Sequence, residues 1–135
     1  MISMSNKFIK IFLSGIIAAA IMSLLIAISP VLGFPRLAVW QIISSVLKTS
    51  LVIGWSAHFA IGVIFAFVYF YLKKSFKIFL GIFGGLIFGF GIFLGVQAFT
   101  FLFLKNSFEI LSALGSLIGH LVFGGILGYL LKKEN

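Results

Sequence analysis

Residues 51–72 read LVIGWSAHFAIGVIFAFVYFYL, an uncharged run of 22 residues that contains a single histidine, His58. A run of this length and composition is long enough to cross the roughly 30 Å hydrocarbon core of a membrane as an α-helix. Three more long apolar runs occur, and the charged residues lie at their ends or between them. We therefore expect four transmembrane helices, at about 8–29, 51–72, 78–103 and 110–131.

Composition supports the same class of protein. Of 135 residues, 62% are hydrophobic and 9% are charged, and the mean hydropathy is +1.31. A water-soluble fold of this size could not cover its surface with so few polar residues. The first run follows two lysines, as a secretory signal does, but it is too long and has no clean cleavage site, so we expect a retained helix. The chain has no cysteine, which excludes disulfides and thiolate metal sites.

The expected fold is an all-α membrane protein with one domain, residues 1–135, and four helices in an up-down-up-down bundle. The basic residues give its orientation, because cytoplasmic loops carry an excess of lysine and arginine. One side would hold seven lysines and the other only three basic residues, which places both termini in the cytoplasm. The formal charge of +8 then faces anionic lipid headgroups and requires no nucleic acid. The two sides are Lys7, Lys10, Lys73, Lys74, Lys77, Lys132 and Lys133, against Arg36, Lys48 and Lys105.

A short amphipathic helix is expected between the first two spans, at about 35–47. Ser29-Pro30 should end the first span, because proline lacks an amide donor and restricts the residue before it. Pro35 is suited to the first position of the next helix. Apolar residues then recur at steps of three and four, which indicates a helix lying on the outer membrane surface. Such a helix is either an interface anchor or a cover over an outward-facing cavity.

Glycines recur four residues apart in the third and fourth spans. Small residues at this spacing form a groove that lets helix backbones approach closely in lipid. The pattern predicts tight packing within the bundle, or contact with a second copy or a larger membrane complex. The alternative is that the missing side chains leave room for a flat cofactor. The series are Gly81, Gly85 and Gly89, and Gly115 and Gly119 followed by Gly124 and Gly128.

The two histidines, His58 and His120, lie at similar depth. His58 is 15 residues before Lys73, and His120 is 12 residues before Lys132. At ~1.5 Å per residue these separations are about 22 and 18 Å from the same end. In the expected bundle the second and fourth helices are diagonal, so both imidazoles would point at the axis. Ionisable groups inside a membrane are functional-site candidates by default.

Other residues at that depth give the histidines neighbours. Ser23 in the first span, and Ser116 one turn before His120, are expected as hydrogen-bond partners of the imidazoles. Burial in hydrocarbon favours uncharged imidazole, and no span carries an Asp or Glu to compensate, so both histidines should be neutral.

Four uses of the histidine pair are compatible with the sequence. The simplest is structural, with each histidine fixing helix packing through hydrogen bonds. The second is axial ligation of a b-type haem across the bundle. In the third they bind a metal with help from Met22 or water, since two ligands are too few for a closed zinc site. In the fourth they line a path for a small solute or lipid. The glycines expected to line a haem are Gly54, Gly62, Gly89, Gly91 and Gly124.

No set of catalytic residues is recognisable. No acid lies beside either histidine, there is no GxSxG element, and the glycines sit inside apolar runs rather than in a phosphate-binding loop. We do not expect an enzyme, although a redox subunit with a partner would be compatible with the haem alternative.

Two segments match each other in frame, Gly54-x3-His58-x3-Gly62 and Ser116-x3-His120-x3-Gly124, which suggests a duplicated helical hairpin. Gly54-Trp55-x2-His58-Phe59 and Gly119-His120-x3-Gly124, with Pro30 and Gly33 after the first span, resemble a group of small bacterial four-helix membrane proteins of unknown function. The resemblance covers nearly the whole chain. It implies the four-helix fold and that the histidine helices are the family's recurring element, and it carries over no activity. We expect the protein in the bacterial cytoplasmic (inner) membrane.

Overall fold

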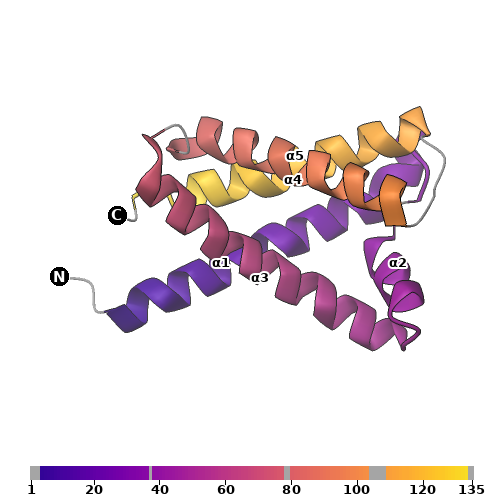
Figure 1. Ribbon diagram of the computed structural model, residues 1–135, viewed down its shortest axis with the longest axis horizontal. Helices are drawn as coiled ribbons and strands as arrows, with labels where there is room; N and C mark the ends of the chain where they lie inside the picture. Colours follow the sequence, from indigo (N-terminus) through magenta and orange to yellow (C-terminus); the bar gives the residue numbers. More distant parts are fainter. Residues whose placement is uncertain (1–3, 37, 78–79, 104–108, 134–135) are drawn as a thin grey trace.

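The computed structural model describes residues 4–36, 38–77, 80–103 and 109–133. These residues contain four long helices, α1 (Met4–Ile28), α3 (Leu51–Ser75), α4 (Gly81–Phe103) and α5 (Ile110–Leu130), and no strand (Figure 1). All four are long and apolar enough to cross a membrane. They coincide with the four predicted spans to within a few residues, except that α1 begins earlier and residues 78–79 lie outside the described part of the chain.

The connection between α1 and α3 differs from the prediction in one respect. α1 ends at Ile28, and Pro30 lies in a 3-10 turn, Ser29–Leu32, closed by Gly33 with φ 84°. The short helix α2 (Val39–Val46) then begins later than Pro35, the predicted first residue. Pro35 instead lies in the connection, where its carbonyl accepts a hydrogen bond from the Ser29 hydroxyl at 3.4 Å, and Ala38 is the N-cap residue of α2.

The helices form two close pairs joined through α1. α1 packs on α3, α4 packs on α5 over most of their length, and α1 also contacts α5. Figure 1 shows α1 crossing α3 obliquely, whereas α4 and α5 run side by side. α3 and α4 meet mainly near the turn that joins them, where the ring centroids of Tyr69 and Phe88 are 5.2 Å apart. α3 and α5, which carry the histidines, therefore share α1 as their common neighbour.

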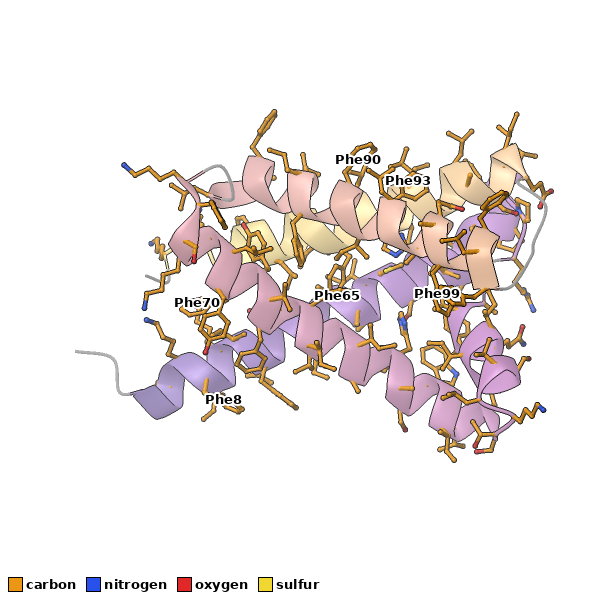
Figure 2. All side chains as sticks on the ribbon, viewed as in Figure 1. Phe8, Phe65, Phe70, Phe90, Phe93 and Phe99 are labelled. Atoms are coloured by element: carbon orange, nitrogen blue, oxygen red, sulfur yellow. The ribbon has the colours of Figure 1, made fainter. Side chains whose placement is uncertain are left out.

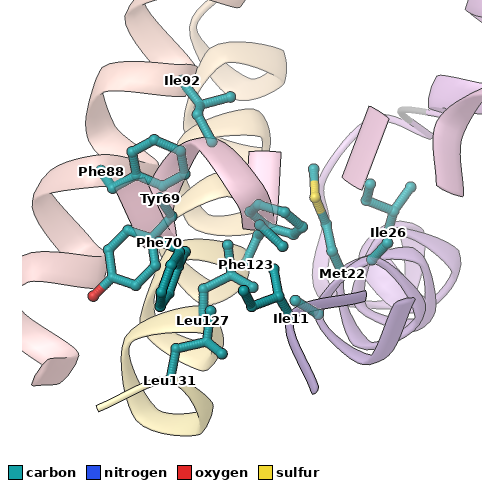
Figure 3. Packing of buried hydrophobic residues seen from close by; sticks show 13 residues of the cluster. Ile11, Met22, Ile26, Tyr69, Phe70, Phe88, Ile92, Phe123, Leu127 and Leu131 are labelled. Carbon is teal, nitrogen blue, oxygen red and sulfur yellow. The ribbon is translucent and has the colours of Figure 1, made fainter. Parts of the chain in front are cut away.

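The core consists of apolar side chains from all four long helices (Figure 3). Its α1 members are spaced three, four or seven residues apart, which keeps one face of that helix buried. Most large apolar side chains outside the core are exposed, as expected where the surrounding solvent is lipid. Figure 2 shows Phe90 on the outer side of α4 and Phe65 between α3 and α4. The labelled core residues are Ile11, Met22, Ile26, Tyr69, Phe70, Phe88, Ile92, Phe123, Leu127 and Leu131.

Lys73 is a buried cation at the end of the bundle. It is 4% exposed, and its Nζ donates a hydrogen bond to the carbonyl oxygen of Leu131, the residue that caps α5. A cation at a helix C-terminus interacts favourably with the helix dipole and satisfies a carbonyl that has no partner within the helix. Lys73 therefore holds the end of α3 against the end of α5, a role that the count of flanking lysines did not predict.

Candidate functional site

His58 is buried in α3 and bonded across to α1. Its Nε2 lies 3.0 Å from Oγ of Ser23, which is also buried. The same Oγ donates to the carbonyl oxygen of Ala19 at 2.8 Å. A hydroxyl has one hydrogen, so Ser23 accepts from His58 and the neutral imidazole carries its proton on Nε2. This hydrogen bond joins two helices.

His120 is buried in α5 and bonded within its own helix. Its Nδ1 lies 2.7 Å from the backbone oxygen of Ser116 and 3.3 Å from that residue's Oγ. A carbonyl oxygen only accepts, so Nδ1 carries the proton and Nε2 has the lone pair. The two histidines therefore have opposite tautomers. Ser23 and Ser116, the two expected partners, each lie beside one of them.

α1 brings the two histidines to one level of the bundle. Consecutive residues of α1 face different neighbours: Ser23 meets His58 of α3, and Met22 packs against Gly119 of α5, the residue before His120. A β-carbon on Gly119 would lie 3.4 Å from Cε of Met22. Met22 is a core residue here, in contact with other apolar groups (Figure 3).

An aromatic cluster covers His58 on the side of α2. The rings of Trp40 and Trp55 stack with centroids 3.9 Å apart and planes 11° from parallel, and each lies 6.4 Å from the imidazole. Gly54 allows this approach, because a β-carbon there would overlap the backbone oxygen of Trp40. The stack was not predicted. The available signal was that Trp55 lies near the start of the second span and Trp40 in the short helix before it, since aromatic side chains gather at membrane interfaces.

The glycines expected to line a haem do not border a common gap. The space beside Gly54 is filled by α2. Gly62 packs against α1, where its β-carbon would lie 2.9 Å from Cβ of Ala19. Both α3 glycines are therefore used for contacts between helices.

The remaining haem-lining candidates are used in other ways. Gly89 and Gly124 lie against each other's helix, whereas Gly91 is exposed, and a β-carbon there would have nothing within 4 Å. Nε2 of His58 is also engaged by Ser23. These residues do not fit a haem held between the two imidazoles.

Within the described part of the chain, no three residues of the types His, Cys, Asp and Glu come together as a metal site would require. What the arrangement offers is two imidazoles held by serines, aromatic rings and close helix contacts. Comparison of the chain with protein families, with curated proteins and with solved structures finds no match.

Proposed function

We propose that this chain is an integral protein of the bacterial cytoplasmic membrane in which His58 and His120 serve helix packing rather than catalysis. The observation that carries this proposal is the buried hydrogen bond of 3.0 Å between Ser23 and His58, which links α1 to α3. Side-chain hydrogen bonds between helices are a recognised source of stability in lipid, where the alternative is an unsatisfied polar group.

The proposed topology is up-down-up-down with both termini in the cytoplasm. It is supported by Figure 1, in which α1 begins and α5 ends at the same end of the molecule. It is also supported by the sequence, which has lysines next to the start of α1 and the end of α5. Because the chain has no cysteine, single variants Lys48→Cys and Lys74→Cys report on one side each. A membrane-impermeant maleimide should label Lys48→Cys in intact spheroplasts and Lys74→Cys only after permeabilisation. The reverse pattern would invert the topology.

We further propose that α2 lies in the outer interface and anchors α3. The support is the Trp40–Trp55 stack, since tryptophan is favoured at the headgroup level and its ring packs against apolar neighbours. This position makes α2 a cover over the His58 side of the bundle.

A double-mutant cycle tests the structural role of His58. Ser23→Ala and His58→Ala should each destabilise the protein, and the coupling energy between them should be about 0.6 kcal/mol, the average for such bonds in membrane helices, and no more than about 1.7 kcal/mol, the largest value. The measurement is unfolding of the detergent-solubilised protein by increasing SDS, followed by circular dichroism. Strictly additive losses would show that the two side chains do not interact.

The haem alternative is tested on the same preparations. We expect the purified protein to be colourless before and after reduction, because His58 already donates Nε2–H to Ser23. A Soret band that disappears in both His58→Ala and His120→Ala, in variants that keep their helical spectrum, would overturn the structural assignment in favour of bis-histidine ligation.

A further inference from the structure

A groove of about 380 Å³ runs between α1 and α5 on the outside of the bundle. Asn6 and Lys10, in the first turns of α1, are at one end, and Leu13 and Ile17 follow along the same helix face. From Lys10 to Ile17 is seven residues, or about 10 Å along the helix. Leu130, in the last turn of α5, forms the opposite wall. The groove therefore leads from a charged end toward the middle of the helices.

The interior of the groove is apolar. Ser14 also lines it, but its hydroxyl donates to the backbone oxygen of Lys10 at 2.8 Å and so satisfies a group of its own helix. The remaining wall consists of Ile9, Leu13, Ile17 and Leu130. A trough of this kind fits a hydrocarbon chain, while the amide of Asn6 and the ammonium of Lys10 at its end are hydrogen-bond donors.

The end of the α1/α5 groove that holds Lys10 is cationic. Lys10 is the charged residue among those that line it. Lys132 and Lys133 follow Leu130 by two and three residues, but the Lys132 ammonium lies 4.9 Å from the ring centroid of Tyr129, which lines the other groove. Basic pockets between transmembrane helices on the cytoplasmic side are typical binding sites for anionic lipid headgroups. A second groove, of about 400 Å³ between α4 and α5, is lined by Leu86, Leu121 and Tyr129 among others, and the Lys132 ammonium lies over the Tyr129 ring.

We propose that the α1/α5 groove binds an anionic phospholipid, with the phosphate at Asn6 and Lys10 and an acyl chain along Leu13 and Ile17. This inference rests on the proposed membrane location. The lysine supplies the preference for an anionic headgroup, worth about fivefold per lysine near a membrane surface. The apolar trough binds the acyl chain of the lipid. A water-soluble phosphate has no acyl chain and should therefore bind more weakly.

The test uses the full chain in mixed micelles that contain equal amounts of phosphatidylglycerol and phosphatidylcholine with identical acyl chains. Native mass spectrometry should detect phosphatidylglycerol bound in about fivefold preference over phosphatidylcholine. Lys10→Gln should abolish most of this preference. Lys74→Gln is the matched control, because Lys74 is an exposed lysine toward the same end that does not line the groove, and this variant should keep the preference.

Two further measurements separate the headgroup from the trough. Leu13→Trp, which fills the groove, should reduce retention of both lipids, and soluble glycerol phosphate should not displace the bound lipid. Equal effects of Lys10→Gln and Lys74→Gln, or displacement by glycerol phosphate, would overturn the proposal. If Leu13→Trp does not fold, the comparison of Lys10→Gln with Lys74→Gln still tests the lipid site. The maleimide experiment tests membrane location separately, so failure of the lipid proposal is distinguishable from failure of the proposed membrane location.

Discussion

The α1/α3 pair and the α4/α5 pair are built on equivalent contacts, but their backbones approach to different extents. Gly62 and Gly124 each follow a histidine by four residues, and each faces a glycine of the partner helix, Gly15 in α1 and Gly85 in α4. On α4 and α5 the neighbouring positions are also glycines. On α1 and α3 the corresponding positions are Ala19 and Ala66, whose methyl groups hold the helices further apart.

This difference explains why the two histidines have different partners. Where α4 approaches α5, Gly89 lies directly against the backbone of His120, and Nδ1 of that histidine bonds to Ser116 in its own helix. Where α1 crosses α3 less closely, there is room for Ser23 to bond His58. The α4/α5 pair has the closer helix contact, and the α1/α3 pair has the hydrogen bond between helices. The duplicated hairpin stays a prediction from the sequence.

The largest expected effect is at Gly85. A β-carbon there would overlap the backbone oxygen of Gly124 and lie 3.0 Å from Cα of Gly128, and backbone atoms cannot move aside as a side chain can. Gly85→Ala should therefore cost about 3 kcal/mol or more, at the upper end of overpacking effects. The measurement is the free energy of unfolding by SDS in detergent.

Gly91→Ala is the matched control in the same helix. Nothing lies within 4 Å of a β-carbon at Gly91, and the residue is exposed. Alanine is favoured over glycine inside a helix by roughly 0.5–1 kcal/mol, so this variant should be as stable as the parent or slightly more stable. Equal stability of Gly85→Ala and Gly91→Ala would show that α4 and α5 do not pack through this face.

The sequence predicted the helices well and their partners poorly. Apolar length alone locates the four long helices, since a span depends on local composition. The glycine series predicted a close contact but not its partner, because the same spacing serves a neighbouring helix or a second copy. Lys73 and the Trp40–Trp55 stack depend on which helix ends meet, and no local pattern encodes that. Counting residues from the flanking lysines did identify Ser23 as a neighbour of the histidines, because the rise per residue is constant along a helix.

A smaller effect is expected at Gly15, the counterpart of Gly85 in the first pair. A β-carbon there would lie 2.7 Å from Cα of Val63 and 3.0 Å from the backbone oxygen of Gly62, which is crowded but less so than at Gly85. Gly15→Ala should cost about 1–2 kcal/mol. Ala20→Leu, on the exposed face of α1, is the control and should change little. A larger loss of stability in Gly15→Ala than in Gly85→Ala would mean that α1 and α3, rather than α4 and α5, are the more closely packed pair.

The smallest effects should separate the two serines. Ser23→Ala removes the hydroxyl that accepts from Nε2 of His58 and should cost about 1 kcal/mol. Ser116→Ala should cost less than about 0.5 kcal/mol, because Nδ1 of His120 keeps the Ser116 backbone oxygen at 2.7 Å, which survives the substitution. Both variants are measured by SDS unfolding beside the parent protein. A loss of stability in Ser116→Ala as large as that in Ser23→Ala would mean that the Ser116 hydroxyl, rather than its carbonyl, holds His120. The bond within α5 would then not be the counterpart of the bond between α1 and α3.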